Sequence, residues 1–593
     1  MPRALKFALS SLLIGAMSVG LAYAGAILVP GSNAPTASSG AGGWLAKADN
    51  SSDQAEEGVV AASGVALEPL KENQVYAGAH KVNIAPRAAA YGGEWNTTDC
   101  DSSSPLGSPP PKSDPTDFRV RWLENSNCIY AGGYDIGPAN AITNFDEEFG
   151  LWARATAISD GEDTVVLMIL DGAYYFAKYG QMCNDDTDHA SVYDGEGPGA
   201  NTYTQDCGFR DLQNSMAAKY GYTADTRGEL GIEPASFLLA SSHAHASPDF
   251  VGAWGGVPRW YMQQVEDAIR EAVYGAIDSM EPAFIEAGEV LYRGGNNNRR
   301  GHYHAAEEAT EAWMRFVAEN ASGTPAPPGK RTVATIGTYA AHPVDSVDEG
   351  RGYADLAGVF AARAEERFGG IGLFFQTGFG NISSRGSRRG VAEQLVNFIP
   401  DVGHGPQVTG SLDVKSVMRT FDQPATNVVL SAGGASGVFD RPFEARPSAI
   451  SIGKGSLSPE EDVRKGMENP EDFQDMRAPH KRCNSASALT VNSSVSVAKI
   501  GSLLITGGPG ELFSNYTNTI KEQYRGGIAF PLSLVNDGLG YIMQSIETDH
   551  VGRQAVGFVN GPLSEYEDAY SIDGCFGDHA LEQTLAGIQQ LLQ

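Results

Sequence analysis

The stretch Ser236-Phe-Leu-Leu-Ala-Ser-Ser-His-Ala-His-Ala-Ser-Pro-Asp249 joins a short apolar run to two histidines that are two residues apart. The run Phe237–Ala240 is typical of a buried β-strand. Side chains at positions i and i+2 of an extended chain point the same way, so His243 and His245 should converge at the end of this strand. Two such imidazoles suit a metal ion or a proton-transfer centre, and they equally suit a hydrogen-bonded pair of surface histidines. The pattern alone does not choose between these alternatives.

Around this stretch, strand patterns alternate with helix patterns. The apolar runs Trp152–Ile158 and Thr164–Leu170 are separated by a short polar turn, which predicts a β-hairpin. After Pro258, apolar residues recur at four-residue spacing from Val265 to Ile277, which predicts an amphipathic helix. This alternation predicts a mixed α/β fold, with one or more mixed sheets and flanking helices. Further strands are expected over 333–339, 371–375 and 503–506, and further helices over 353–368 and at the C-terminus.

Polar side chains also follow other predicted strands. His342 follows the strand at 333–339, Glu511 follows the strand at 503–506, and Tyr541 closes a glycine-rich segment. Because α/β proteins build their sites at the rim where buried strands end, these side chains are candidates for one site with the two histidines. Each also has a structural alternative, since His342 could cap its strand and Glu511 could lie at a helix N-terminus.

The composition limits the classes of partner. The chain of 593 residues carries 42 Lys and Arg against 72 Asp and Glu, which gives a net charge of -30. Such an acidic excess argues against nucleic-acid binding and against electrostatic docking on anionic lipid. An uncharged substrate remains compatible with it.

The N-terminus has the features of an export signal. Arg3 and Lys6 precede an apolar run, and Ala22-Tyr-Ala24 matches a small-x-small cleavage site. We therefore predict a signal peptide over residues 1–24 and a secreted, periplasmic or extracellular location. An uncleaved membrane anchor is the alternative, because the uncharged sequence continues past the cleavage site. Residues 25–75 are rich in Gly, Ala and Ser, which predicts a flexible linker.

The cysteines favour disulfides over a zinc-thiolate site. There are six of them, an even number, and none forms a Cys-x-x-Cys pair. Sequence does not fix their connectivity, and we predict pairing between neighbours because it would close three polar insertions. The predicted pairs are Cys100–Cys128, Cys183–Cys207 and Cys483–Cys575.

Several short motifs resemble those of the neutral (non-lysosomal) ceramidase family, and they occur in the family's order. The family signature Thr-His-Thr-His-Ser-Gly-Pro is similar to Ser242-His-Ala-His-Ala-Ser-Pro248. The resemblance covers about residues 76–593 and is that of a divergent member. The other motifs that carry it are Asn296-Asn-Asn-Arg299, Tyr339-Ala-Ala-His-Pro343, Gly352-Tyr-Ala-Asp355, Gly380-Asn-Ile-Ser383, Pro509-Gly-Glu511, the turn Asn536–Tyr541 and the closing segment Glu565–Leu581.

The resemblance implies a zinc-dependent amidohydrolase with one Zn²⁺ per chain. Carried over motif by motif, the family's zinc ligands are His243, His342, Glu511 and Tyr541. His245 corresponds to the general base. Two nitrogen and two oxygen donors suit Zn²⁺, which polarises an amide carbonyl and lowers the pKa of its water to about 7.

The resemblance also implies roles around the zinc. Arg299 and Tyr566 match substrate-binding positions, and Tyr570 matches a second catalytic position. The expected substrate is a lipid amide, which implies transient contact with a membrane or micelle. The family's C-terminal immunoglobulin-like domain is expected to be missing. The catalytic domain is expected to span 76–593, with insertions near 87–128, 183–207 and 386–480, the last with few regular elements.

The chain departs from the family pattern close to the expected site. Ala244 and Ala246 replace Thr and Gly of the signature, and Asp249 adds an acid directly after it. Gly538 replaces the first tyrosine of the Asn-x-Tyr-x-x-Tyr turn. Ser383 either lines the pocket or turns the chain after a strand.

Three functions remain open. The first is hydrolysis of an N-acyl amide bond by a metal-activated water, with ceramide giving a sphingoid base and a fatty acid. The second keeps the zinc but acts on another N-acyl amide or an ester. The third is a secreted binding module without catalysis, which the presence of His245 disfavours because such a module needs no general base.

Overall fold

The computed structural model of the chain describes residues 68–98, 100, 127–133, 140–180, 208–300, 308–318, 331–344, 350–435, 439–452, 485–544, 567 and 570–593. All of them belong to the unit that spans Val60–Gln593. The unit is built on two β-sheets, and apolar side chains from both sheets form its core.

The larger sheet is mixed. Its strand pairs are antiparallel except for β11–β13 and β6–β7, which are parallel. Parallel β6 and β7 therefore end at the same edge of the sheet, just before the histidine pair. The order is β13 (Ile371–Gln376), β11 (Arg331–Tyr339), β10 (Thr310–Ala318), β8 (Glu281–Leu291), β1 (Gln74–Asn83), β5 (Trp152–Ser159), β6 (Thr164–Leu170) and β7 (Phe237–Ser241).

The smaller sheet packs face to face with the larger one. Apolar side chains from both sheets, among them Leu167 and Ile336 of the larger and Ile505 and Phe530 of the smaller, form one buried cluster. Burial of this apolar surface is the main stabilising contribution to the unit. The smaller sheet runs β15 (Val414–Pro424), β17 (Ser485–Ile500), β18 (Leu503–Gly507) and β20 (Ala529–Leu532), with β16 (Glu444–Ile452) also paired to β17.

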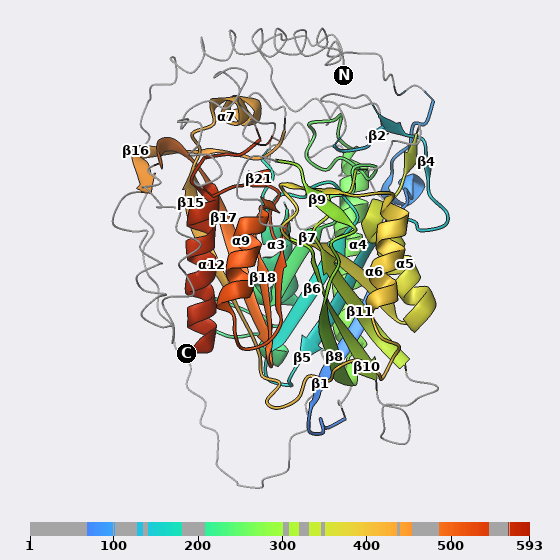
Figure 1. Ribbon diagram of the computed structural model, residues 1–593. Helices are drawn as coiled ribbons and strands as arrows, with labels where there is room; N and C mark the ends of the chain where they lie inside the picture. The colour runs from blue at the N-terminus through green and yellow to red at the C-terminus, as the bar shows by residue number, and fades with distance from the viewer. Residues whose placement is uncertain are drawn as a thin grey trace, which may run out of the picture. The chain divides into compact units, whose positions relative to one another are not determined.

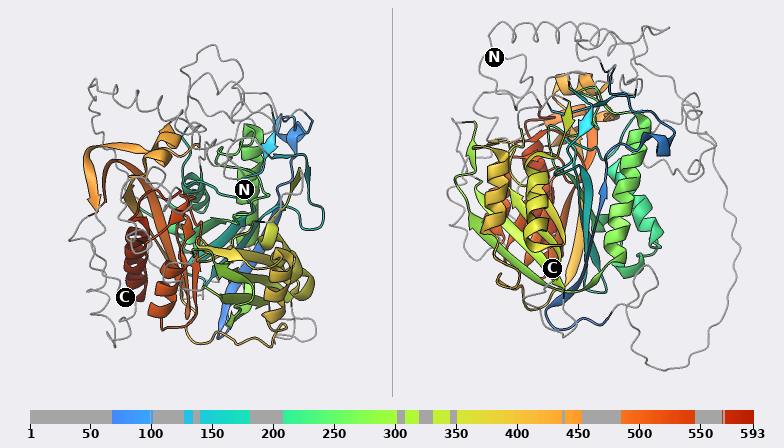
Figure 2. Two further views of the ribbon diagram at one scale, coloured as in Figure 1. Left: turned by 45° about the horizontal axis from the view of Figure 1, so that its top comes forward. Right: turned by 90° about the vertical axis from the view of Figure 1, so that its right-hand side faces the viewer.

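Helices cover the outer faces of both sheets. On the larger sheet, α4 (Arg259–Asp278) packs on β1 and β5, while α5 (Asp355–Phe368) and α6 (Arg388–Phe398) cover β11 and β13. On the smaller sheet, α9 (Ser514–Gln523) and α12 (Phe576–Leu592) pack on the outer face. In Figures 1 and 2 the red α12 accordingly lies on the opposite side of the sheets from the yellow α5 and α6.

The remaining elements are short and mostly lie in the connections. The longest of them is α3 (Phe209–Lys219). The others are β2 (Ile129–Tyr130), β3 (Ala141–Ile142), β4 (Asn144–Phe145), β9 (Asn296–Asn298), β12 (Arg351–Gly352), β14 (Ile382–Ser384), β19 (Glu511–Leu512), β21 (Tyr541–Ile542), α7 (Val428–Ala435) and the 3₁₀ turns η1 (Ala88–Tyr91), η3 (Glu229–Gly231) and η4 (Pro234–Ser236).

Most elements expected from the sequence are present. The run Phe237–Ala240 lies in β7, the predicted hairpin is β5–β6, and Pro258 is the N-cap of α4. The expected strands at 333–339, 371–375 and 503–506 correspond to β11, β13 and β18, and the helices at 353–368 and the C-terminus to α5 and α12. The predicted α/β class with mixed sheets and flanking helices is confirmed.

The expectation of few regular elements over 386–480 is wrong. This segment contains α6, α7, β15 and β16, and β15 pairs with β17 along its full length, from Val414–Ile500 to Pro424–Thr490. Among the described strands β15 pairs with β17 alone, so it lies at the edge of the sheet, and it carries Lys415 and Arg419. Polar residues are common on such edge strands, which hides the apolar alternation.

One predicted disulfide, Cys100–Cys128, is formed. Cys575 is also disulfide-bonded, but its predicted partner Cys483 and the pair Cys183–Cys207 lie outside the described residues. The predicted signal peptide, nearly all of the predicted linker and the insertion at 183–207 lie outside them as well.

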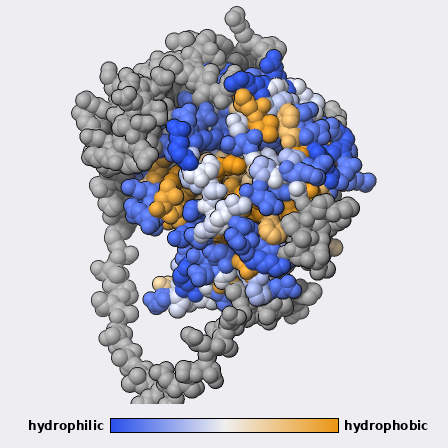
Figure 3. Space-filling view, turned by 60° about the horizontal axis from the view of Figure 1, so that its bottom comes forward, coloured by the Kyte–Doolittle hydropathy of each residue, from blue (hydrophilic) through white to orange (hydrophobic). Residues whose placement is uncertain are grey.

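The surface is mixed in character. On the face shown in Figure 3, hydrophobic side chains occur in small groups among hydrophilic ones. None of the helices in the described part of the chain is long and apolar enough to cross a membrane.

Candidate metal centre

The two histidines of the opening stretch follow β7 in a turn. His243 has a φ of +58°, in the left-handed region that residues other than glycine seldom adopt. The predicted extended geometry is therefore wrong, yet the imidazoles do converge, with the Nε2 atoms of His243 and His245 3.1 Å apart. The end of β6 holds His243 in place, because its N–H donates to the Gly172 carbonyl and its Nδ1 lies 3.0 Å from the Ala173 carbonyl oxygen. Such left-handed residues cluster at functional sites.

Two further strand ends bring His342 and Glu511 to the same point. Nε2 of His342 lies 3.3 Å from Nε2 of His243. Oε2 of Glu511 lies 3.5 Å from that same Nε2 of His243 and 3.8 Å from Nδ1 of His342. His243, His342 and Glu511 are at most 4% exposed and His245 is 8% exposed, so the whole group is shielded from water. The structure therefore brings together the four side chains that the sequence placed at strand ends.

The spacing of these atoms fits a tetrahedral metal ion. Bonds of about 2.0–2.1 Å to zinc place neighbouring donor atoms about 3.3 Å apart. From Nε2 of His243, the donor atoms of His342 and Glu511 lie at 3.3 and 3.5 Å. Oε2 of Glu511 is buried without a hydrogen-bond partner, which would be costly unless a cation compensated it. One ring nitrogen from each of His243, His245 and His342 lies within 4.8 Å of the other two.

The electrostatics of the group favour a cation as well. Burial lowers the pKa of His243 and of His342 well below the ordinary histidine value, and burial together with the charge of Arg299 lowers the pKa of His245 to about 3. The imidazoles are therefore neutral at pH 7, as metal ligation requires. Burial raises the pKa of Glu511 to about 8 although the charge of Arg299 lowers it, so the nearby positive charge does not offset the cost of burying this carboxylate.

Tyr541 and Arg299 lie beside Glu511. β21 begins at Tyr541 and pairs in parallel with β19, which begins at Glu511, so the two side chains share one register position. The Tyr541 hydroxyl hydrogen-bonds Glu511 and accepts a 2.9 Å bond from Nη2 of Arg299. Arg299 is fixed by the Gly380 carbonyl at 2.7 Å and by an ion pair with Glu567, also at 2.7 Å. The expected fourth ligand and an expected substrate contact are thus adjacent.

The other predicted site residues are more distant members of this group. The carbonyl of Tyr570 accepts the N–H of Tyr541 at 3.1 Å, and the Tyr570 ring packs in the cluster with Tyr541, Phe513 and Met543. Tyr570 therefore contacts the site through Tyr541. Tyr566 lies outside the described residues.

Ser383 belongs to a strand beside His342. It lies in β14 and forms a parallel bridge with His342, while the neighbouring Ser384 hydroxyl donates to the His342 carbonyl at 3.1 Å. Ser383 thus lies within a strand and not in a turn after one, and its backbone helps to place this histidine.

Asp249 organises a loop of its own. Its carboxylate accepts four backbone N–H bonds of 2.7–3.1 Å, from Val251, Gly252, Trp254 and Gly256. These bonds shape the loop 249–256 that follows the histidine pair. Ala244 and Ala246, the other two departures from the signature, are fully buried.

Tyr174 is a member of the site that the sequence analysis missed. Its hydroxyl hydrogen-bonds Oε1 of Glu511, and its ring meets that of His243 edge-on at 4.7 Å. The Tyr174 ring also stacks on that of Trp254, with 6.2 Å between the ring centroids. Tyr174 follows the end of β6, so the strand-end argument that identified His342 and Glu511 would have found it.

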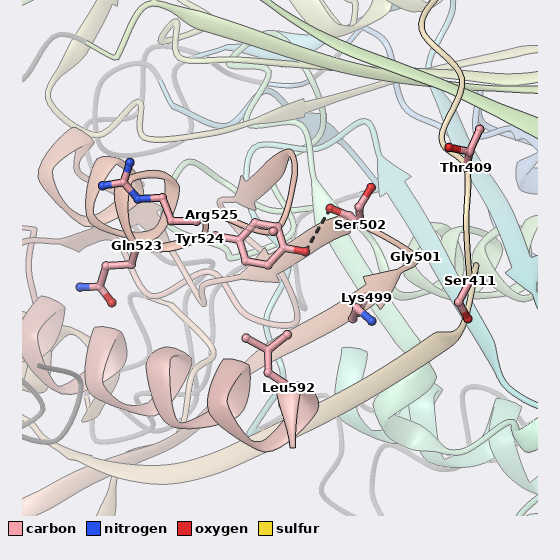
Figure 4. A pocket seen from close by; sticks show the side chains of 10 residues that line it. Thr409, Ser411, Lys499, Gly501, Ser502, Gln523, Tyr524, Arg525 and Leu592 are labelled. Atoms are coloured by element: carbon pink, nitrogen blue, oxygen red, sulfur yellow. Dashed lines mark hydrogen bonds between the residues drawn. The ribbon is translucent and has the colours of Figure 1, made fainter. Parts of the chain in front are cut away.

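A surface pocket at the other end of β18 is separate from this centre (Figure 4). It has a volume of about 380 Å³, and the Tyr524 hydroxyl in its wall donates to the Ser502 carbonyl at 3.0 Å. Ser502 precedes β18, whereas Glu511 follows it, so the pocket and the histidines lie toward opposite strand ends. Its lining is Thr409, Ser411, Lys499, Gly501, Ser502, Gln523, Tyr524, Arg525, Gly526 and Leu592.

Comparison with known proteins identifies the fold. No protein-family model and no curated protein matches the sequence. Among solved structures, the neutral ceramidase from Pseudomonas aeruginosa is similar, with 14% identity and a TM-score of 0.53 over 88% of this chain and 75% of that one. A ceramidase complexed with C2 gives 13% identity and a TM-score of 0.50 over 88% and 76% of the two chains. The chain therefore has the mixed α/β fold of the neutral ceramidases.

Proposed function

We propose that this chain is a zinc-dependent amidohydrolase that cleaves an N-acyl amide bond, with ceramide as the substrate. The observation that carries the proposal is the buried convergence of three neutral imidazoles and a carboxylate around His243. A structural cluster would have no need to bury an unpartnered carboxylate oxygen there. The fold shared with a neutral ceramidase supports the choice of an amide substrate.

His243, His342 and Glu511 would hold the ion, and Tyr541 would supply a further oxygen. When bound, zinc supplies Lewis-acid polarisation of a carbonyl group and activation of a water molecule. Glu511 would present Oε2 to the ion, because its Oε1 accepts the hydrogen bond of Tyr174.

His245 would transfer the proton. The backbone of Gly133 hydrogen-bonds the His245 ring, and its Nε2 faces His243 Nε2. In the neutral ring, Nε2 can accept a proton from the attacking water and pass it to the nitrogen of the leaving amine. Water is thus added across the amide bond, which gives a fatty acid and a free amine.

Arg299 and Tyr541 would stabilise negative charge. The guanidinium of Arg299 bonds the phenol of Tyr541, so a positive charge and a hydroxyl lie together beside Glu511. Preorganised donors of this kind stabilise the charge that develops on a carbonyl oxygen during amide hydrolysis. We keep Tyr570 as a residue that positions Tyr541, and the substrate contact of Tyr566 stays a prediction.

Secretion remains part of the proposal. It is supported by the N-terminal export pattern and by the disulfide Cys100–Cys128, since disulfides persist mainly in oxidising compartments.

The test is fatty-acid release from N-acyl-sphingosine by the purified protein, with bound zinc measured in parallel. We expect release that a chelator abolishes and added zinc restores. His243→Ala should lose both zinc and activity, because this ring contacts every other member of the group. His245→Ala should keep the zinc and lose about 100- to 10,000-fold in rate, the usual contribution of a general base.

His404→Ala is the matched control, since this histidine is exposed and should leave zinc and activity unchanged. Release that persists in the chelator and in His243→Ala would overturn the proposal. Bound zinc without release from N-acyl-sphingosine would direct the search to other N-acyl amides or esters. Zinc loss in His245→Ala would make His245 a ligand and leave the proton transfer to another group.

A further inference from the structure

We propose that Tyr174 is a structural member of the metal centre, where its phenol positions Glu511 for metal binding. This inference rests on the proposed function only in taking the centre to bind a metal. Tyr174 reaches the centre from the end of β6 in the larger sheet, whereas Glu511 belongs to the segment after β18 in the smaller sheet.

The two oxygens of Glu511 have different surroundings. Oε1 accepts the hydrogen bond from the Tyr174 hydroxyl, while Oε2 faces His243 at 3.5 Å and His342 at 3.8 Å. A donor on Oε1 therefore fixes the rotation of the carboxylate and leaves Oε2 toward the histidines. Hydrogen bonds of this kind to a ligating group orient it and commonly change metal affinity by about 10- to 100-fold.

The ring of Tyr174 is held as firmly as its hydroxyl. The ring lies 4.7 Å from that of His243 between centroids, with an interplanar angle of 79°, and it stacks on the ring of Trp254 with an interplanar angle of 3°. Trp254 is itself held in place, because its backbone N–H donates a 2.7 Å hydrogen bond to the carboxylate of Asp249. This carboxylate organises the loop 249–256. The acid that follows the histidine pair thus supports the centre through Trp254 and Tyr174.

The glycine at 538 makes room for this tyrosine. A Cβ at Gly538 would lie 3.0 Å from Cβ and from Cδ1 of Tyr174, closer than ordinary van der Waals contact. Gly538 has no left-handed φ, so its backbone would accept a side chain and only Tyr174 opposes one. Position 538 is where the motif quoted above has its first tyrosine. We infer that the phenol at this place comes from position 174 instead of 538.

The experiment measures metal affinity by competition with a chelator, together with the visible spectrum of the Co²⁺-substituted protein. Tyr174→Phe keeps the ring and removes only the hydroxyl. We expect about 10- to 100-fold weaker zinc binding and a changed Co²⁺ spectrum. Tyr175→Phe is the matched control, because this neighbouring phenol bonds Glu266 at 3.2 Å, a carboxylate outside the centre. It should leave zinc affinity and spectrum unchanged.

A relocated phenol provides the second test. Gly538→Tyr alone should weaken zinc binding and lower the melting temperature, because the new side chain collides with Tyr174. In Tyr174→Ala/Gly538→Tyr the collision is removed, and we expect recovery relative to Tyr174→Ala alone. Melting curves would show that each variant folds.

Unchanged zinc affinity and Co²⁺ spectrum in Tyr174→Phe would overturn the inference. If Tyr174→Ala and Tyr174→Ala/Gly538→Tyr bound zinc with equal affinity, a tyrosine at position 538 could not replace the phenol of Tyr174. That result would overturn the inference that position 174 supplies the phenol instead of position 538. If the protein binds zinc but hydrolyses no amide, the proposed function fails while the Tyr174 result still stands. A protein that binds no metal would overturn both.

Discussion

At the scale of single residues, the site depends on a few close backbone approaches. Gly133 is one of them, since its φ is +109° and a Cβ there would lie 2.5 Å from Cγ and Nδ1 of His245. The backbone of Gly133 also interacts with the His245 ring. A glycine is therefore required at this position for two reasons, the backbone conformation and the space.

Gly133→Ala should displace the His245 ring and lower the rate of amide hydrolysis by about 100-fold, since a misplacement of about 1 Å can cost that much. Zinc content should change little, because His243, His342 and Glu511 are untouched. Gly92→Ala is the matched control, with a φ of +66° and no atom within 4 Å of the added Cβ. Gly92→Ala has the same cost of placing a side chain on a left-handed backbone, but its new Cβ contacts no other atom. Equal rates for the two variants would show that Gly133 does not position His245.

At the scale of elements, strand ends were the most informative feature of the sequence. The apolar runs of β7, β11 and β18 were evident, and the polar residues after them predicted His243, His342 and Glu511 as one group. The parallel pairing of β19 with β21 could not be predicted, because each is two residues long. Because this pairing was not predictable, only the family resemblance indicated that Tyr541 lies near Glu511.

Other features escaped prediction for different physical reasons. β15 is a polar edge strand, so its alternation is weak. The turn at His243 depends on tertiary hydrogen bonds to Gly172 and Ala173, which no local pattern encodes. Tyr174 was missed because a tyrosine after a strand is less specific for metal chemistry than a histidine or glutamate.

The loop 249–256 is an element built on one carboxylate, so its stability should depend on Asp249. In Asp249→Ala, four N–H groups lose their acceptor, two of them buried and two partly buried, and we expect the free energy of unfolding to fall by about 2–4 kcal/mol. Metal affinity should fall in the same variant, because Trp254 no longer supports Tyr174. Denaturant unfolding and chelator competition measure the two effects.

Asp225→Ala is the comparison for that experiment, since Asp225 is exposed. Its unfolding free energy should stay within about 0.5 kcal/mol of the parent protein. If Asp249→Ala were equally mild, the loop would be held by something other than this carboxylate.

At the scale of the whole molecule, the centre joins the two sheets. His243 and His342 follow β7 and β11 of the larger sheet, whereas Glu511 follows β18 of the smaller one. The common core between the sheets therefore sets the distance between the ligands. Global stability and metal binding should be linked, because a site assembled from both sheets is absent from the unfolded chain.

Acid should lower the free energy of unfolding, because the buried histidines bind protons more readily in the unfolded chain. His579 allows this effect to be measured at a histidine outside the metal centre. His579 lies on α12, where burial lowers its pKa to about 4, and its Nδ1 is 3.1 Å from Oε1 of Gln423. The unfolded chain binds a proton at a pKa of about 6.5. A depressed folded pKa stabilises the fold fully above pH 6.5, and that contribution is lost as the pH falls toward 4. Between pH 7.5 and pH 5 the loss from this residue should be about 2 kcal/mol.

Urea unfolding of the metal-free protein at these two pH values tests this prediction. Part of the parent protein's loss comes from His243, His245 and His342, whose pKa values are also lowered, so the comparison must be between variants. His579→Gln should lose about 2 kcal/mol less than the parent between pH 7.5 and pH 5, because it has no proton to bind. His404→Gln, an exposed histidine, should lose as much as the parent. An equal loss in all three proteins would mean that the pKa of His579 is the same in the folded and the unfolded chain.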